Sequence, residues 1–146
     1  MPPNVILDTS VLVSAFLFPE SVPGQVFSLA ERGVYGAHFS MIVVEELKRS
    51  LRNPRLKKAY GYTDEKAQTW CGELNEIGFH IRKVLPEIEP VCRDPDDDHV
   101  IAAAIAVKAA YIVTGDEDLL VLGQYQNICI VTAREFLDRI TGKENH

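Results

Sequence analysis

Two short apolar segments of this chain each end at an aspartate. Residues 5–7 are followed directly by Asp8, and residues 111–113 are followed by Thr114, a glycine and Asp116. A carboxylate at the mouth of a buried strand loses hydration unless a hydrogen bond or an opposite charge compensates it. Each acid could simply cap the helix or turn that comes next. The alternative is that both acids face one shared site.

The acidic run DPDDD, residues 94–98, stands one residue before a fully apolar stretch, residues 100–107. Asp94 can cap a helix there with Pro95 in its first turn, and further acids suit the positive end of the helix dipole. Capping explains the other acids of the run but leaves Asp98, which shares a helical face with apolar residues. Because this helix is apolar all round, periodicity does not decide which acid faces inward.

Two glutamates lie on a predicted helix over residues 41–52. Glu45 has Lys48 and Arg49 three and four residues ahead, which is typical of a solvated ion pair. Glu46 borders the apolar stripe of the helix, so it is the better site candidate, with an ordinary surface glutamate as the alternative.

The acids must be positioned by elements that the sequence also predicts. We predict strands at 5–7, 37–39, 79–84, 111–113 and 128–131, and helices at 10–18, 23–32, 41–52, 63–77, 95–110 and 133–140. Strands that alternate with helices indicate a parallel sheet covered by helices on both faces, in a single domain over 1–141 with a polar tail at 142–146. Ligands of such sheets bind beyond the carboxyl ends of the strands. Asp8 and Asp116 should therefore share one crevice.

An open parallel sheet would gather four carboxylates at one edge: Asp8, Glu46, Asp98 and Asp116. Like charges at that separation cannot all ionise without a counter-charge. Ligands that are all oxygen, with no histidine or cysteine, favour Mg²⁺ or Mn²⁺ over zinc. Such ions commonly position phosphates and activate water.

The net charge of −6 counts against nucleic-acid binding by bulk electrostatics. The charge is unevenly distributed, however, because residues 48–58 contain six basic residues and no acid. With Tyr60 and Tyr62 close behind, this segment could contact RNA phosphates and stack on bases. The alternative is a solvated helix end whose cations suit the helix dipole.

Cellular context follows from what the chain lacks. Its three cysteines are far apart and form no metal or disulfide pattern, which indicates reduced thiols. No apolar run approaches the roughly 18 residues of a membrane span. The start of the chain does not resemble a secretory signal. We therefore expect a cytoplasmic protein with no membrane association.

Taken together, the chain resembles the PIN-domain family, particularly the VapC-like group of toxin components from toxin–antitoxin systems. The matching pieces are LDTSVLVSA (7–15), SMIVVEEL (40–47), RDPDDDHVIAAA (93–104), VTGDEDLL (113–120) and VTAREFL (131–137). Each piece is short, but their order and spacing together cover nearly the whole chain. The resemblance implies a three-layer α/β/α sandwich with a central, mostly parallel sheet, and a Mg²⁺- or Mn²⁺-dependent ribonuclease.

The resemblance also implies which residues do the chemistry. It selects as catalytic acids Asp8, Glu46, Asp98 and Asp116, with Asp8, Asp98 and Asp116 as metal ligands. Ser10, Thr114 and Asp118 would orient ligands or water around the metal, although asparagine is more frequent than serine at position 10. Whether Asp94 or Asp118 contacts the metal stays open. In the implied reaction, activated water attacks the phosphorus of an RNA phosphodiester.

The partners implied are an RNA substrate, a cognate antitoxin and a second copy of the chain in a homodimer. The RNA contacts would come from the basic segment, through Lys48, Arg49, Arg52 and Arg55. Two alternatives remain. One is a phospho-acceptor receiver-like domain, which also places acids around Mg²⁺, and the other is a non-catalytic binding or oligomerisation module whose acids only cap helices.

Overall fold

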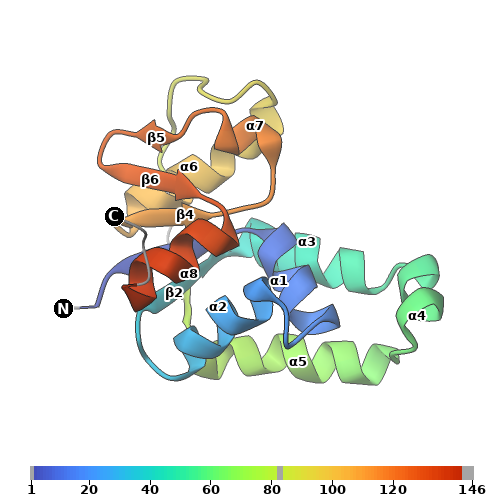
Figure 1. The fold of residues 1–146 in the computed structure, drawn as a ribbon. Coiled ribbons are helices and arrows are strands. Elements are labelled where there is room, and N and C mark those ends of the chain that lie inside the picture. The colour runs from blue at the N-terminus through green and yellow to red at the C-terminus, as the bar shows by residue number, and fades with distance from the viewer. Residues whose placement is uncertain (1, 82–83, 143–146) are drawn as a thin grey trace.

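The computed structural model describes residues 2–81 and 84–142. Its six strands form one sheet in the order β3-β2-β1-β4-β6-β5 (Figure 1). The strands are β1 (Asn4–Leu7), β2 (Gly36–Ser40), β3 (Phe79–Ile81), β4 (Tyr111–Val113), β5 (Gln124–Tyr125) and β6 (Ile128–Val131). All neighbouring pairs are parallel except β5 and β6, which form an antiparallel hairpin at one edge. The mostly parallel sheet expected from the sequence is confirmed.

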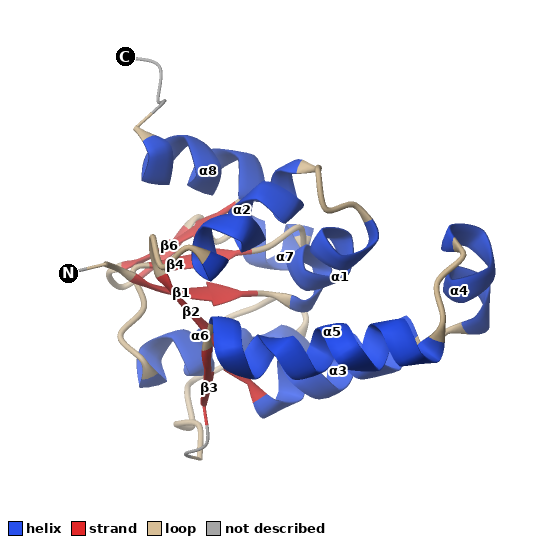
Figure 2. Ribbon diagram, turned by 90° about the horizontal axis from the view of Figure 1, so that it is seen from below, coloured by secondary structure: helices blue, strands red, loops and turns tan. Residues whose placement is uncertain are grey.

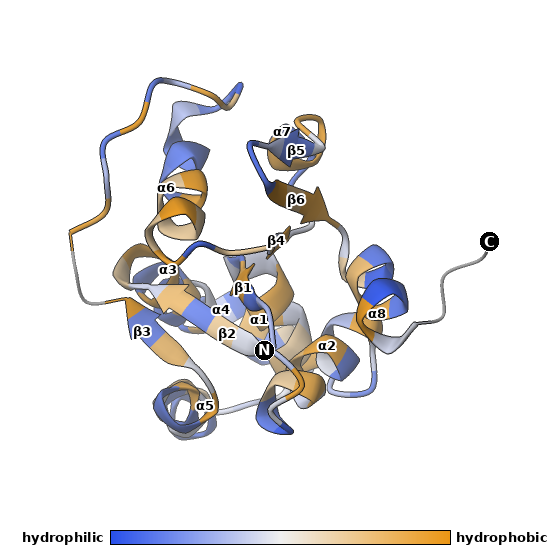
Figure 3. Cartoon of the chain, turned by 90° about the vertical axis from the view of Figure 1, so that its left-hand side faces the viewer, coloured by the Kyte–Doolittle hydropathy of each residue, from blue (hydrophilic) through white to orange (hydrophobic). Residues whose placement is uncertain are grey.

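Helices cover both faces of this sheet (Figure 3). They are α1 (Thr9–Leu17), α2 (Val22–Glu31), α3 (Met41–Leu51), α4 (Pro54–Tyr60), α5 (Asp64–Ile77), the 3₁₀ turn η1 (Pro95–Asp97), α6 (Asp98–Ala106), α7 (Glu117–Leu120) and α8 (Ala133–Thr141). The predicted α/β/α sandwich is therefore the observed architecture.

The two layers of core follow from the two-residue period of the strands. In β1, Val5 and Leu7 pack with helices α1, α2, α3, α5 and α8 on one face. Ile6 points the other way and packs with α6 and with Leu119 of α7. Val5, Ile6 and Leu7 are all buried, on one face or the other, so the strand is apolar after Asn4, and the next polar residue, Asp8, comes where it ends.

Hydroxyl caps begin several helices where the sequence predicts them. The Ser40 side chain accepts a hydrogen bond from the Val43 amide at the start of α3, and Thr63 does the same at α5. Thr132 and Glu135 form a reciprocal capping box at α8. These caps fix the direction in which each helix leaves the sheet, and so the position of the strand ends.

Several elements differ from the predicted ones. The strand predicted at 79–84 is observed as β3 over Phe79–Ile81, and residues 82–83 of that prediction lie outside the described residues. The short helix α7 was not among the predicted helices. Helix α3 ends at Leu51, shortly before Pro54 as predicted, but Pro54 also begins a further helix, α4. A proline fits the first turn of a helix, and the Asn53 side chain caps this one. The short β5 strand carries no alternating pattern and was not predicted. Helix α6 is preceded by a 3₁₀ turn and ends at Ala106, before Lys108 takes a positive φ of 54°. The polar tail at 142–146 lies outside the described residues apart from Gly142.

Helix α4 stands apart from the sandwich, at the far end of α3 and α5 (Figure 2). Its basic residues thus extend beyond the sheet rather than covering it. Among the described residues, no single helix is long and apolar enough to cross a membrane. Helices α1 and α2 reach that length and apolarity only as a pair bent by 97°.

Two glycines of the α5 region allow a matched test of this packing. A Cβ atom on Gly78 would lie 2.5 Å from the Ala37 carbonyl oxygen and 2.6 Å from the Phe39 ring, whereas one on Gly72 meets nothing within 4 Å. We expect Gly78→Ala to lower the free energy of unfolding by about 1–3 kcal/mol, because the sheet must shift. Gly72→Ala, inside α5, should raise it by about 0.5–1 kcal/mol. Urea denaturation would measure both, and equal effects would contradict the close approach of α5 to β2.

Candidate metal and active site

The end of β1 holds the most buried acid of the chain. The Asp8 carboxylate is 9% exposed and accepts hydrogen bonds from the Thr9 amide at 2.8 Å and from the Thr114 hydroxyl at 2.7 Å. Thr114 follows β4 and is 1% exposed. The backbone adds a third link, because the Asp8 amide donates to the Val113 carbonyl at 3.0 Å. Asp8 thus caps α1 and is also fixed to the end of the neighbouring strand.

The loop between β4 and α7 is folded around the same threonine. The Thr114 hydroxyl accepts a hydrogen bond from the Asp116 amide at 3.0 Å, and the Asp116 carboxylate accepts one from the Asp118 amide at 2.9 Å. Ser10 completes the link across to α1, since its hydroxyl accepts from the Gly115 amide at 3.1 Å. The side chains of Ser10 and Thr114 therefore position the loop that carries Asp116 and Asp118.

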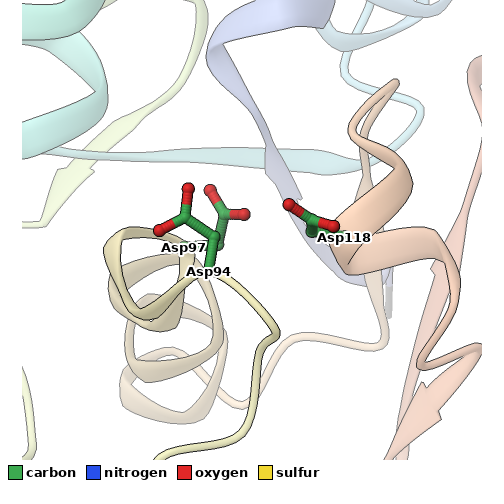
Figure 4. A group of neighbouring side chains, drawn as sticks. All are labelled: Asp94, Asp97 and Asp118. Atoms are coloured by element: carbon green, nitrogen blue, oxygen red, sulfur yellow. The ribbon is translucent and has the colours of Figure 1, made fainter.

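A group of three aspartates faces this loop. Carboxylate oxygens of Asp94, Asp97 and Asp118 all lie within 4.8 Å of one another. Figure 4 shows Asp94 and Asp97 reaching from the turn before α6 towards Asp118 on α7. Arg93 binds Asp118 with two nitrogens, at 2.6 and 2.8 Å from Oδ1. The Arg93 guanidinium therefore contacts the aspartate group from its exposed side.

Asp97 connects this group to the strand-end acids. Burial, the neighbouring carboxyl group of Asp116, and the charges of Asp94 and Asp8 together raise the pKa of Asp97 to about 7. Its Oδ2 atom is buried and makes no hydrogen bond among the described residues. Five aspartates from three segments far apart in sequence thus converge at the carboxyl ends of β1 and β4.

Asp98 binds the loop before η1, and its expected role as a metal ligand stays a prediction. Its Oδ1 atom accepts hydrogen bonds from the amides of Cys92 at 2.8 Å and Val91 at 3.3 Å. The Cys92 amide holds the pKa of Asp98 below its usual range, although burial opposes the effect. Asp97 and Asp98 differ in direction because Asp97 ends the 3₁₀ turn η1 and Asp98 follows it. The tighter winding of this turn directs Asp97 towards the acids and Asp98 towards the preceding loop.

Glu46 lies on the neighbouring wall rather than among the aspartates. Its Oε1 atom is 3.4 Å from Nε2 of His99 on α6. Within the described residues, the group with metal-ligand spacing contains none of the four predicted catalytic acids, Asp8, Glu46, Asp98 and Asp116. Asp8 and Asp116 lie close enough to Asp97 to raise its pKa, and Glu46 lies beside His99 on the neighbouring wall. The catalytic roles of these four acids stay predictions.

The basic residues of α3 divide between two surfaces. Lys48 and Arg52, one helical turn apart, line a cavity of about 370 Å³ between α3 and α5. Arg49 instead lines a hollow that includes Glu46 and His99. Arg55 lies on the separate helix α4. The four proposed RNA contacts therefore do not form one continuous patch around the acids.

The aromatic residues after this segment also differ from expectation. Tyr62 is buried and its hydroxyl donates to the Leu51 carbonyl at 2.8 Å, so it has no free face for a base. Tyr60 is half exposed and packs edge to face against Phe18, at 5.2 Å between ring centroids. No sequence motif predicts this contact between Phe18 and Tyr60.

The aspartate cluster has the composition of a site for a hard divalent cation. Its donors are all carboxylate oxygens, and the buried Oδ2 atom of Asp97 is available as a ligand. The raised pKa of Asp97 comes first from burial and then from the neighbouring carboxyl groups, whose negative charge a divalent ion would offset. The residues present therefore fit Mg²⁺ or Mn²⁺. Asp97 and Arg93 were not singled out from the sequence, because capping accounted for Asp97 and only the fold brings Arg93 to Asp118.

Comparison with known proteins gives two matches. A model of the PIN domain matches residues 4–118. The uncharacterized protein MJ1680 of Methanocaldococcus jannaschii is 30% identical over 124 residues, which cover 82% of this chain and 74% of that protein. Residues 4–118, which the domain model matches, include Asp8, Asp94, Asp97, Asp116 and Asp118.

The raised pKa of Asp97 predicts a pH dependence of stability in metal-free protein. Between the ordinary value of 3.8 and about 7, the native state keeps a proton that the unfolded state has lost. The free energy of unfolding should therefore fall as the pH rises through this window. Asp97→Asn should flatten this part of the profile and be more stable than wild type above pH 7. Thermal denaturation in chelator measures both, and parallel profiles would contradict the crowding of acids around Asp97.

The different positions of Asp97 and Asp98 predict opposite phenotypes. Asp98→Ala leaves the amides of Val91 and Cys92 without their acceptor and should cost about 1–3 kcal/mol of stability while Mn²⁺ binding remains. Asp97→Ala should weaken Mn²⁺ binding without this loss of stability. Calorimetric titration with Mn²⁺ and urea denaturation separate the two effects. If Asp98→Ala lost the metal and Asp97→Ala kept it, the assignment would be reversed.

Proposed function

Because the chain belongs to the PIN-domain family, whose members are generally metal-dependent nucleases, we propose that it hydrolyses RNA phosphodiester bonds. The observation that carries this proposal is the buried Oδ2 atom of Asp97, which receives no hydrogen bond from a donor among the described residues and lies among the carboxyl groups of its neighbours. A set of acids arranged only to cap helices would not leave such an atom without a partner. The crowding instead supports a site that a divalent cation completes.

Asp97, Asp94 and Asp118 would hold Mg²⁺ or Mn²⁺, with Asp8 and Asp116 completing the acidic wall. When bound, the ion would polarise a phosphate oxygen and lower the pKa of a water molecule. The chain's own residues prepare the position. The Thr114 hydroxyl and the Thr9 amide keep the Asp8 carboxylate oriented, and the proton held by Asp97 in the absence of metal must leave as the cation enters.

Other polar residues support this arrangement from outside. Ser10 holds the loop that carries the acids of α7 through the Gly115 amide. Arg93 holds the Asp118 carboxylate in place beside the cluster. Asp98 fixes the 91–92 backbone, so we propose that it supports the site rather than ligating the metal. Glu46 stays a catalytic candidate on the adjoining wall.

RNA would approach the cluster from the side of α3. Arg49 is the basic residue whose hollow adjoins the acids, so it would contact the phosphate backbone next to the cleaved bond. Lys48, Arg52 and Arg55 would bind more distant phosphates. The bound cation and these side chains would together compensate the net charge of −6 where the substrate passes.

A biological role as the toxin of a toxin–antitoxin pair follows from the resemblance alone. The cognate antitoxin, the homodimer and the cytoplasmic location stay predictions. The receiver-like alternative would need paired acids after the first strand and a lysine after a later one. Here Asp8 stands alone, and β6 is followed by Thr132, Ala133 and Arg134. Failure to take up phosphate from a small phosphodonor would exclude that alternative.

Cleavage of labelled single-stranded RNA tests the proposal directly. We expect activity with Mn²⁺, none with chelator, and a loss of at least about 100-fold in Asp8→Asn and Asp97→Asn, since both remove charge from the metal site. Asp98→Asn should stay within about tenfold of wild type, because an amide oxygen can still accept from the 91–92 backbone. Cleavage that persists in both site variants would show a contaminating nuclease and remove the assignment.

A further inference from the structure

Helix α4 contributes little to the core of the protein. None of its residues, all of which the structure describes, is buried, and Leu56 packs against the core while only partly covered. The helix stands apart from the sheet, at the far end of α3 and α5 (Figure 2). An ion pair between Lys57 and Asp64, at 2.9 Å, ties it to the start of α5. The exposed groups of α4 are therefore better explained by binding than by folding.

An exposed pair of aromatic rings lies at the end of this helix. Tyr60 is 50% exposed and Phe18 is 44% exposed, and their ring planes meet at 88° with the centroids 5.2 Å apart. Exposed apolar side chains are ordinary when they stand singly. Here two rings from separate segments form a right-angled corner, which we call the aromatic corner. Since each ring is about half exposed, the corner presents flat aromatic surface to solvent.

The backbone holds both rings of the aromatic corner in place. The Phe18 amide donates to the Ser14 carbonyl at 2.8 Å, and the Phe18 carbonyl accepts from the amide and the hydroxyl of Ser21 at 3.0 and 2.6 Å. Tyr60 is the last residue of α4, and Gly61 closes the helix with a positive φ of 67°. A surface fixed in this way loses little conformational entropy when a flat group stacks on it.

The aromatic corner belongs to a basic stretch of the chain. Residues 52–60 contain four basic residues and no acid. Lys57 pairs with an acid of α5, whereas the other three are exposed and make no ion pair among the described residues: Arg52, Arg55 and Lys58. A second copy bound through the same helix would bring like charges together, which opposes self-association. An anionic partner with flat faces complements both the charge and the rings.

We propose that the aromatic corner stacks an unpaired base of single-stranded RNA while the neighbouring cations bind its phosphates; this inference rests on the proposed nuclease function and names the form of its substrate. Stacking of a base on an aromatic side chain contributes about fivefold to 150-fold in affinity. In a duplex each base is already paired and stacked on its neighbours, so the corner favours single strands. Because the corner contains none of the acids, it binds RNA without taking part in cleavage.

Binding of labelled RNA without metal tests this inference separately from catalysis. The protein would be titrated in chelator into a fluorescent single strand of mixed sequence, and into the duplex that this strand forms with its complement. Tyr60→Leu and Phe18→Leu keep apolar bulk but lose the ring. Each should weaken single-strand binding at least about fivefold, measured by anisotropy, and leave duplex binding unchanged. Tyr60→Phe keeps the ring and should bind like wild type.

Phe79→Leu is the matched control for the loss of an exposed ring. Phe79 is 60% exposed and also contacts a second ring, that of His38, with the centroids 5.0 Å apart. It lies on β3, which follows α5, whereas α4 precedes α5, so the two sites are at opposite ends of that helix. Phe79→Leu should therefore change neither affinity.

Several results would overturn the inference: no measurable binding by wild type, equal affinities of Tyr60→Leu and Tyr60→Phe, or an equal loss on the duplex. A wild-type dimer that Tyr60→Leu converts to monomers in sedimentation would also overturn it, because a second copy would then cover the corner. Ring-dependent binding by a wild type that cleaves no RNA with Mn²⁺ would support the stacking site and reject the nuclease. Cleavage by wild type, with binding that depends on neither ring, would do the reverse.

Discussion

The hydrogen bond from the Thr114 hydroxyl to the Asp8 carboxylate is the contact on which the rest of the site depends. It joins the ends of β1 and β4, the two central parallel strands, in a place that solvent hardly reaches. The same hydroxyl accepts from the Asp116 amide, so one threonine sets the relative positions of two acids. The apolar packing on both faces of the sheet determines where this contact forms, and the contact determines where charge accumulates.

Negative charge at this edge is only partly compensated among the described residues. The turn before α6 serves two purposes at once, because Asp94 accepts from the Asp96 amide while its carboxylate belongs to the aspartate group. Capping and metal binding are therefore not competing explanations of the acidic run. Asp98 is spared from the crowding by its bonds to backbone amides, and Arg93 balances part of what remains.

The sequence was sufficient for the parts of the structure that follow local rules. Strand and helix periodicity, together with caps such as Ser40 and Thr132, predicted the layers and the edge where the acids meet. The sequence could not decide whether Asp97 or Asp98 lies nearer the other acids. An α-helix and a 3₁₀ turn rotate neighbouring residues differently, and several residues of the run are acidic. The burial of Tyr62 and the pairing of Glu46 with His99 depend on contacts between elements, which no local pattern encodes.

The aspartates are also far apart along the chain, and this affects when the site can exist. Asp8 and Thr114 are separated by 106 residues, and the outermost acid, Asp118, comes later still. During synthesis, a chain that has emerged only as far as β3 holds Asp8 and its local partner, the Thr9 amide, but neither Thr114 nor any other aspartate of the group. The cluster therefore assembles late, after the long loops between its segments have closed. A protein of this design gains its reactive centre only when almost all of its sheet is in place.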